Sequence, residues 1–283
     1  MINKILIFFI ILISFSTTKV NAVLLEDISI LVASCDKYAG LWEPFVTLLF
    51  KNWPSLEAGN EHQNIPIFFI SNKKKLNNLR INNIRFPNEI SWSDNISNTL
   101  DQINTKYVLY LQEDYLFTDP INIDLLAKIL QYAKTQNAAY VSLISMGQTI
   151  KNNKLIESPI NLAEIDKNSE YRTSLQAAIW EKEVFSRLLK PGENMFVFEK
   201  AGSKRSENLD RLFLANVNGN VLKYINAADG GKILESAVDY LHSQNIKFNP
   251  DSQQLSLKKE NNFYRLIRKI KWKILNLLEV LYK

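Results

Sequence analysis

Two stretches of the sequence decide the fold: residues 28–38 read ISILVASCDKY, and residues 107–115 read YVLYLQEDY. Each opens with a short run of mainly β-branched and apolar residues, over 28–33 and 107–111, and then becomes polar. Such runs are typical of strands that are buried on both faces of a parallel sheet. Residues 65–70 form a third run of this kind, and apolar residues at helical spacing follow the first run at 42–50.

Helical and strand-like patterns continue to alternate along the chain. We expect a helix that is capped by Ser93 or Asp94 and ends near Ile103, a helix over 123–132 and a strand over 140–143. This alternation predicts an α/β fold with a Rossmann-like, mostly parallel sheet and helices on both faces. No repeat or low-complexity linker interrupts the sequence between 28 and 250, so a single domain is expected over residues 23–257.

Composition excludes several classes of protein. The chain has 283 residues, and 46% of them are hydrophobic, which supplies a folded core and argues against disorder. Its single cysteine excludes an internal disulfide framework and a cysteine-rich zinc site. Two histidines are too few for a histidine-built metal centre, so any catalytic metal would bind oxygen atoms.

The net charge of +5 is unevenly distributed along the chain. Residues 1–22 carry +2 and residues 258–283 carry +6, so the intervening residues 23–257 carry −3. A protein that binds nucleic acid normally carries a basic stripe on its folded body. The distribution therefore argues against nucleic acid as a partner and favours a membrane surface.

Residues 1–22 have the pattern of a signal peptide. Lys4 precedes an apolar run over 5–15 that is too short to span a membrane as a helix, and the small residue Ala22 ends the segment. Cleavage after Ala22 is expected, and a buried or interfacial N-terminal helix is the alternative.

Residues 258–283 are expected to form a basic amphipathic helix. Apolar residues recur at helical spacing from Phe263 to Leu281, and Arg and Lys residues lie on the opposite face. A helix of this kind suits the headgroup layer of an anionic membrane. The alternative is a terminal helix that packs its apolar stripe against the body.

Acidic residues follow the predicted strands. Asp36 comes shortly after the first strand, and Glu113 and Asp114 follow the strand that ends near Leu111. Ligands of such sheets bind at the carboxyl ends of the strands. Adjacent carboxylates repel each other there unless a cation neutralises them, and Mg²⁺ and Mn²⁺ favour one or two carboxylates together with substrate phosphates. Alternatively, Glu113 and Asp114 are only strand-end and turn residues.

Several segments together resemble the bacterial nucleotide-sugar glycosyltransferases of the family-2-like group, which have the GT-A fold. The resemblance runs from about residue 28 to 245 and depends on the order and spacing of the segments, because no single motif is specific. The segments are 34–38 (SCDKY), 52–54 (NWP), 92–95 (WSDN), 113–115 (EDY), 175–180 (LQAAIW), 198–203 (FEKAGS) and 224–226 (YIN).

The resemblance implies a site for a nucleotide-diphosphate sugar donor. The Asp-x-Asp motif of the group falls on residues 112–114, where Asp114 stands at the position of the usual metal ligand and Gln112 replaces the first Asp. A divalent cation, Mn²⁺ or Mg²⁺, is therefore implied, and the departure at Gln112 leaves open a variant that needs little metal or none. Five residues would contact the donor nucleotide: Ser34, Asp36, Tyr38, Asp94 and Glu113.

The resemblance also implies a catalytic base. An inverting transferase needs a carboxylate that takes the proton of the acceptor hydroxyl as the glycosidic bond forms. The group carries this base in a Phe-Glu-x-x-Gly-Ser stretch, which falls on Glu199. Gln176 and Trp180 would line the acceptor side, with Trp180 as a stacking face for a sugar ring. Alternatively, Glu199 is an exposed residue paired with Lys200 or Lys204.

The expected function is that of a hexosyltransferase-like enzyme that moves a sugar to a glycan or lipid-linked acceptor. One alternative is a non-catalytic protein that binds carbohydrate or nucleotide sugar on a degenerate transferase fold. A hydrolase that uses Glu113 and Asp114 as an acid–base pair is weaker, because neighbouring residues of a strand point to opposite faces. The expected location is a membrane, at the cytoplasmic face or in an organelle lumen, and the alternative is secretion after cleavage near Ala22.

Overall fold

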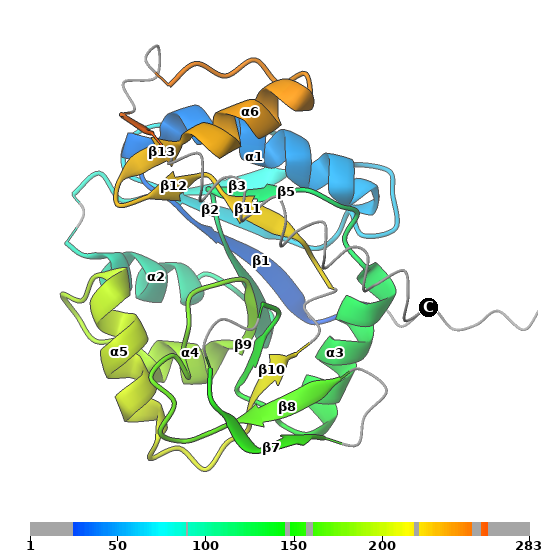
Figure 1. The fold of residues 1–283 in the computed structure, drawn as a ribbon, viewed down its shortest axis with the longest axis vertical. Helices are drawn as coiled ribbons and strands as arrows, with labels where there is room; N and C mark the ends of the chain where they lie inside the picture. The colour runs from blue at the N-terminus through cyan, green and yellow to red at the C-terminus, as the bar shows by residue number, and fades with distance from the viewer. Residues whose placement is uncertain are drawn as a thin grey trace, which may run out of the picture.

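A nine-stranded sheet forms the centre of the computed structural model, which describes residues 25–88, 90–144, 148–156, 161–217, 221–250 and 256–259 (Figure 1). The strand order is β3-β2-β1-β4-β9-β6-β10-β8-β7, and seven of these strands point the same way, with β8 and β9 reversed. The strands are β1 (Ile28–Ala33), β2 (Ile67–Ser71), β3 (Ile81–Arg85), β4 (Tyr107–Gln112), β6 (Tyr140–Ser142), β7 (Ile150–Leu155), β8 (Leu162–Ile165), β9 (Ala178–Glu181) and β10 (Phe213–Asn216).

Helices cover both faces of this sheet. On one face, α1 (Ala39–Asn52), α3 (Ile123–Thr135) and α6 (Glu235–Ser243) contribute their buried side chains to one apolar cluster. On the other, α2 (Trp92–Leu100), α4 (Lys182–Leu188) and α5 (Met195–Ser206) contribute to a second cluster. Alternate residues of β1 reach the two clusters: Val32 joins the first and Leu31 the second. The predicted α/β fold with a mostly parallel sheet is confirmed.

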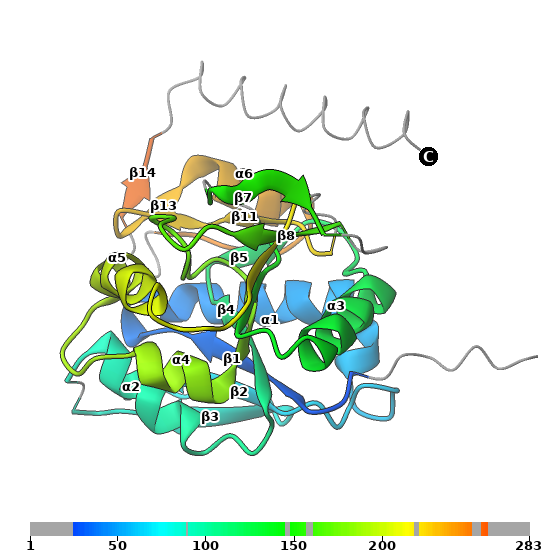
Figure 2. The same ribbon diagram turned by 90° about the horizontal axis from the view of Figure 1, so that it is seen from below.

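Two small sheets and two short 3₁₀ helices complete the described part of the chain. Strand β5 (Tyr115–Phe117) pairs antiparallel with β11 (Tyr224–Asn226). Strand β13 (Lys232–Leu234) pairs with β12 (Ala228–Asp229) and with β14 (Leu257–Lys258), which lies beside it in Figure 2. The 3₁₀ helices are η1 (Asp36–Tyr38) and η2 (Pro54–Leu56).

The element boundaries agree with the sequence patterns at most positions. Strand β1 has the predicted bounds, β2 begins two residues later than expected, and α3 continues past the predicted end at Tyr132. The predicted cap of α2 is wrong, because Ser91 is the capping residue and its hydroxyl accepts the backbone N–H of Asp94.

Both terminal segments of the prediction lie largely outside the described residues, so the signal-like segment 1–22 and residues 260–283 stay predictions. Lys258, the first residue of the expected amphipathic segment, belongs to β14 and pairs with Asp229. Within the described ranges, no helix combines the length and the apolar character that a membrane crossing requires.

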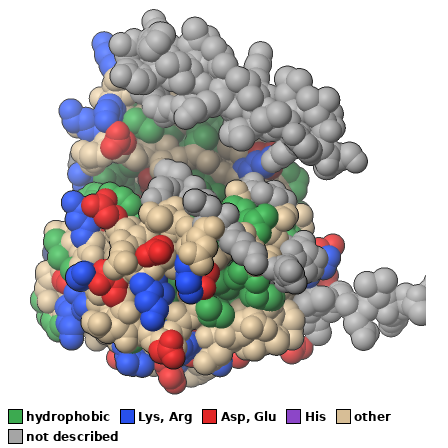
Figure 3. Space-filling view, turned by 60° about the horizontal axis from the view of Figure 1, so that its bottom comes forward, with side chains coloured by type: hydrophobic (Ala, Val, Ile, Leu, Met, Phe, Trp, Pro, Cys, Tyr) green, Lys and Arg blue, Asp and Glu red, His purple; other side chains and the backbone are tan. Residues whose placement is uncertain are grey.

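The surface carries mixed charges and a few large apolar side chains. On the face drawn in Figure 3, acidic and basic side chains are interspersed. Leu79, Ile90 and Phe196 are the most exposed of the large apolar residues described, and Phe196 also lines the cavity described below.

Candidate functional site

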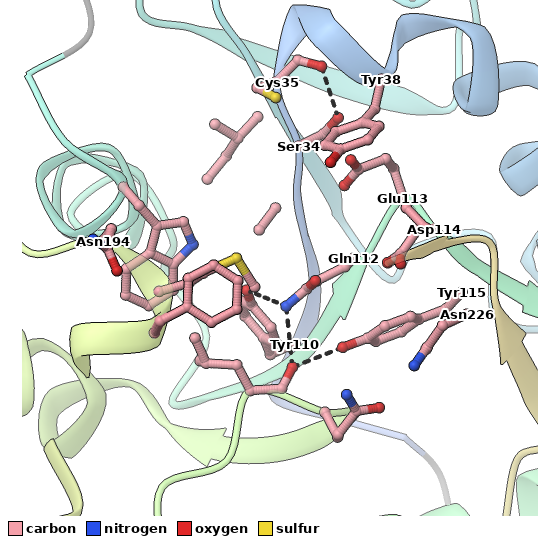
Figure 4. Close-up of a pocket in the computed structure, with 18 of the residues that line it drawn as sticks. Ser34, Cys35, Tyr38, Tyr110, Gln112, Glu113, Asp114, Tyr115, Asn194 and Asn226 are labelled. Atoms are coloured by element: carbon pink, nitrogen blue, oxygen red, sulfur yellow. Dashed lines mark hydrogen bonds between the residues drawn. The ribbon is translucent and has the colours of Figure 1, made fainter. Parts of the chain in front are cut away.

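A cavity of about 630 Å³ opens at the carboxyl ends of β1 and β4 (Figure 4). Ala33 and Gln112, the last residues of these two paired strands, both lie on its wall. The position agrees with the rule that parallel sheets bind ligands beyond the ends of their strands. The remaining wall residues are Ser34, Cys35, Tyr38, Ile70, Trp92, Asn95, Ile96, Tyr110, Glu113, Asp114, Tyr115, Leu175, Gln176, Asn194, Met195, Phe196, Glu199, Asn226, Ala228, Asp229, Gly230 and Gly231.

Glu113 and Asp114 form a turn between β4 and β5, and both side chains line the cavity. The expectation that they point to opposite faces of a strand is therefore wrong. Burial raises the pKa of Glu113 well above its ordinary value, and the neighbouring Asp114 raises it further. Burial also raises the pKa of Asp114 to about 6. Both carboxyls thus lie where a negative charge is disfavoured unless a ligand compensates it.

The wall of the cavity is suited to a hard cation. The Oδ1 atom of Asp114 is buried and accepts no hydrogen bond from any described residue. Four carboxylates line the cavity, namely Glu113, Asp114, Glu199 and Asp229, whereas its described wall has no Lys, Arg or His. No group of three or more His, Cys, Asp or Glu in the described chain could by itself hold a metal. The residues therefore fit an ion that takes only one or two protein carboxylates and completes its shell with ligand oxygens.

Ser34 and Tyr38, two of the predicted donor contacts, do lie on the wall. The Ser34 hydroxyl accepts a hydrogen bond of 2.7 Å from Nε1 of Trp42, which fixes it at the end of β1. Burial raises the pKa of Tyr38 to about 12, with a further contribution from Glu113, so its phenol remains protonated and can donate to a ligand.

Asp36 does not line the described cavity wall, and its carboxylate holds a neighbouring loop instead. It accepts hydrogen bonds of 3.0 to 3.2 Å from the backbone N–H groups of Asn72, Lys73 and Lys74, directly after β2. The backbone N–H of Asp36 in turn donates to Oδ1 of Asn72 at 2.9 Å. The structure thus shows the Asp36 carboxylate bound to the 72–74 loop and away from the described wall, and its contact with the nucleotide stays a prediction.

Asp94 is also absent from the described wall. Its Oδ2 accepts a hydrogen bond from the Ser91 hydroxyl and another, of 3.0 Å, from the backbone N–H of Gly192. The Ser91 bond, followed by the Gly192 bond, lowers the pKa of Asp94. The carboxylate thus joins the start of α2 to the loop between α4 and α5, while the next residue, Asn95, reaches the cavity. The predicted donor contact of Asp94 likewise stays a prediction, since the structure shows only the bonds of its carboxylate to Ser91 and Gly192.

Glu199 projects from α5 onto the cavity wall, where one of its two oxygens is fixed. Its Oε1 accepts hydrogen bonds from the backbone N–H of Leu175 at 2.7 Å and from the Ser174 hydroxyl at 3.2 Å. Its Oε2 makes no hydrogen bond to any described residue. The alternative pairing is not observed among the described residues: neither Lys200 nor Lys204 forms an ion pair with Glu199, and Lys204 pairs with Glu207 instead. Glu199 is thus a carboxylate that is oriented through Oε1 and whose Oε2 is unpaired among the described residues.

The Phe-Glu-x-x-Gly-Ser pattern has a physical explanation in the packing of α5. The Ser203 hydroxyl accepts the backbone N–H of Thr173 at 3.0 Å, one residue before Ser174. A Cβ added to Gly202 would lie 3.1 Å from Oγ1 of Thr173 and 3.1 Å from the ring of Phe198. Gly202 and Ser203 therefore allow the helix to approach the segment that holds Glu199.

Of the two predicted acceptor-side residues, Gln176 lines the cavity and Trp180 lies in the core. Gln176 lies on the wall, where its Oε1 accepts a hydrogen bond of 2.6 Å from the Tyr224 hydroxyl. Trp180 is completely buried in β9, and its ring stacks on Phe185 with a centroid distance of 4.4 Å. It has no face to offer to a sugar, so the prediction for Trp180 is wrong.

Several wall residues were not predicted from the sequence. An apolar part of the wall includes Trp92, Tyr110, Met195 and Phe196. On another part, Tyr115 stacks on Tyr224 of the paired strand β11 with ring centroids 4.2 Å apart. These aromatic residues come from segments far apart in the sequence, and local spacing carries no signal that would bring them together.

Comparisons with solved structures find glycosyltransferases among the similar folds. No protein-family model and no curated protein sequence matches this chain. The S. aureus TarS fragment 1–349 has a TM-score of 0.43 and 10% identity over 68% of this chain and 60% of its own. The mannosyltransferase PcManGT of Pyrobaculum calidifontis, in complex with GDP-Man and Mn²⁺, has a TM-score of 0.48 and 11% identity, covering 72% and 58%. The bifunctional IspDF of Campylobacter jejuni has a TM-score of 0.40 and 11% identity, covering 70% and 52%.

This chain therefore spans about three fifths of the length of the two glycosyltransferase structures. With TM-scores below 0.5, the likenesses carry no conclusion about its activity.

Proposed function

We propose that this chain is a glycosyltransferase that moves a sugar from a nucleotide-diphosphate donor to a glycan or lipid-linked acceptor. The observation that carries the proposal is one cavity that contains both an acidic pair and an oriented carboxylate. Glu113 and Asp114 supply the acidic pair at the carboxyl end of β4, and Glu199 on α5 supplies the oriented carboxylate. The acidic pair suits a donor diphosphate with a cation, and the oriented carboxylate suits an acceptor hydroxyl.

Glu199 would act as the general base in an inverting displacement. The acceptor oxygen forms a bond to the anomeric carbon while the bond between that carbon and the donor diphosphate breaks. The free Oε2 of Glu199 takes the proton of the acceptor hydroxyl, and Oε1 stays bound to Leu175 and Ser174. The fixed oxygen keeps the side chain oriented, so little rotation has to be restricted when the transition state forms.

The leaving diphosphate requires positive charge that the described wall does not supply from basic side chains. A divalent cation, Mn²⁺ or Mg²⁺, would be held by Asp114 through its unbonded Oδ1, with Glu113 beside it. When bound, such an ion neutralises the charge that develops on the diphosphate. Ser34 and Tyr38 remain proposed contacts to the nucleotide, since both line the cavity.

A non-catalytic sugar-binding protein is the second candidate. It is favoured by Gln112, which stands where the glycosyltransferase group carries a carboxylate and whose amide bonds to protein groups instead. A non-catalytic protein that binds carbohydrate would bind the free sugar without needing the nucleotide or Mn²⁺. A non-catalytic protein that binds nucleotide sugar would differ from the transferase only in failing to turn the donor over.

Calorimetric titration tests the proposal. The purified protein is titrated with GDP-mannose and UDP-N-acetylglucosamine, the donors bound in PcManGT and in a TarS structure, each with and without Mn²⁺. Free mannose, free N-acetylglucosamine, GDP and UDP serve as controls. The proposal expects saturable, Mn²⁺-enhanced binding of at least one nucleotide sugar and its nucleotide. Binding of the free sugar alone favours the second candidate, and the absence of binding to every compound contradicts the donor site.

A further inference from the structure

The backbone at Ser174 and Leu175 is held from both sides. On the side of α5, the backbone N–H of Leu175 and the side-chain hydroxyl of Ser174 both donate to Oε1 of Glu199. Its carbonyl oxygens face tyrosines of β6 and β5. The Ser174 carbonyl accepts a hydrogen bond of 3.0 Å from the Tyr140 hydroxyl, and the Leu175 carbonyl accepts one of 2.8 Å from the Tyr115 hydroxyl.

Gln112 completes this arrangement. Its Nε2 donates to the same Leu175 carbonyl at 3.3 Å and to the Tyr110 hydroxyl at 3.2 Å. Figure 4 shows the Gln112 amide and the Tyr115 hydroxyl converging on one oxygen. An ionised carboxylate at position 112 could accept a hydrogen bond from the Tyr110 hydroxyl, but it could not donate one to the Leu175 carbonyl.

We propose that Gln112, Tyr115 and Tyr140 are positioning residues that set the place of Glu199 through the Ser174–Leu175 backbone. These three residues, together with Ser174 and Leu175, are called the 174–175 clamp. The inference deepens the proposed function, on which its catalytic part rests. In this proposal Gln112 helps to position Glu199 and does not bind the donor or a metal.

The surroundings of the clamp make its hydrogen bonds stiff. Tyr115 and Tyr140 are 1% and 0% exposed, and each phenol donates to a backbone carbonyl in a buried hydrogen bond. Leu175 itself is 1% exposed. Breaking one of these bonds leaves a buried carbonyl without a partner, which favours movement of the peptide. Because the Leu175 N–H belongs to the segment that these carbonyls anchor, movement of the segment is transmitted to Oε1 of Glu199.

The first test uses the ligand-free protein and measures hydrogen exchange at the Leu175 amide. Tyr140→Phe is the most informative variant, because Tyr140 is not among the residues that line the cavity. Tyr107→Phe is the matched control, since Tyr107 is equally buried and donates to the Ala133 carbonyl on the opposite face. Exchange at Leu175 is compared with exchange at Leu109 in the middle of β4, which corrects for any change in global stability.

Tyr140→Phe and Tyr115→Phe are each expected to accelerate Leu175 exchange about fivefold to tenfold relative to Leu109, whereas Tyr107→Phe leaves the ratio unchanged. Glu199→Gln marks the exchange rate that results when the carboxylate bond is weakened. An unchanged ratio in Tyr140→Phe, or an equal acceleration in Tyr107→Phe, would overturn the clamp.

The second test measures turnover of whichever nucleotide sugar binds in the titration. Tyr140→Phe should lower kcat about tenfold while the donor KM changes less than about twofold, because the clamp acts on the base and not on the donor. Gln112→Asp should also lower kcat, although it restores the carboxylate of the family motif. Normal kcat in Tyr140→Phe, despite faster Leu175 exchange, would overturn the positioning role. If the exchange results are as expected but the parent protein turns over no donor, the clamp stands and the glycosyltransferase proposal fails.

Discussion

Glu113 and Asp114 are neighbours along the chain, and both of their side chains line the same cavity. Strand β4 ends at Gln112 and β5 begins at Tyr115, so Glu113 and Asp114 form a turn between the two strands. Their side chains therefore do not alternate between the faces of a strand. Burial raises the pKa of both groups, and Asp114 adds to the effect on Glu113. A cation bound between the pair and a phosphate would relieve this unfavourable arrangement.

Replacement of Asp114 by Asn should abolish the Mn²⁺ dependence of donor binding. The amide has almost the same volume but no charge, so we expect affinity for Mn²⁺ in the presence of the nucleotide to fall at least about tenfold. Titration calorimetry measures the change, and Asp124→Asn, which removes an exposed carboxylate in the first turn of α3, is the control. An undiminished response to Mn²⁺ in Asp114→Asn would show that the ion is held elsewhere.

The same variant should alter how the stability of the metal-free protein depends on pH. Because burial raises the pKa of Asp114 to about 6, the folded state disfavours the ionised form. The parent protein is therefore expected to lose stability as the pH rises from about 4, the ordinary value of an aspartate, to above that raised value. Asp114→Asn should lose less stability over this interval. Thermal denaturation in the presence of a chelator measures both curves, and parallel curves would contradict the prediction.

Replacement of Glu199 by Gln should reduce turnover far more than donor affinity. The amide keeps the shape of the side chain but cannot take a proton, so kcat should fall about a hundredfold to ten-thousandfold at saturating substrate. Asp210→Asn is the control, because Asp210 lies after α5, is exposed and does not line the cavity. Steady-state kinetics with calorimetry on the same samples separate the two effects. Near-normal kcat in Glu199→Gln would exclude it as the base.

Asp94→Asn should lower stability without changing donor affinity. The Ser91 hydroxyl and the Gly192 N–H stabilise the ionised carboxylate and lower its pKa. This contribution is complete above the ordinary aspartate pKa of about 4 and is lost as the pH falls through the lowered folded-state value. Since Asp94 is partly exposed, we expect a loss of less than about 1 kcal/mol near neutral pH. Thermal denaturation and donor titration are the measurements, and a large fall in donor affinity would contradict this expectation and support a donor contact by Asp94.

The sequence could predict the strands that build the site, because continuous apolar runs mark buried strands and the polar residues after them mark the carboxyl edge. It did not reveal that β9 would insert between β4 and β6 with reversed direction, since pairing between distant strands leaves no local pattern. Trp180 shows the consequence. Its ring lies in the core because β9 is a central strand, whereas the sequence alone also allowed a ring exposed to ligand.

Single carboxylates were harder to place than strands. Asp36 and Asp94 follow strand-like or polar segments just as Asp114 does, yet nearby N–H and hydroxyl groups bind them. For Asp94 a local signal existed, because Ser91 three residues earlier resembles a capping box. For Asp36 none existed, since its partners at residues 72–74 are supplied by the end of another strand.

A chain that ends at Lys259 should keep its fold and lose affinity for anionic vesicles. Lys258 belongs to β14 and pairs with Asp229, so a cut before it would also damage the sheet that contains β13. Residues 260–283, which lie outside the described structure, carry six of the basic residues, and each one near an anionic surface contributes about 1 kcal/mol of attraction. Sedimentation with vesicles that contain phosphatidylserine measures binding, and vesicles of phosphatidylcholine alone are the control. Circular dichroism checks the fold. Unchanged vesicle binding by the shortened chain, or loss of its fold, would contradict the proposed membrane role of this segment.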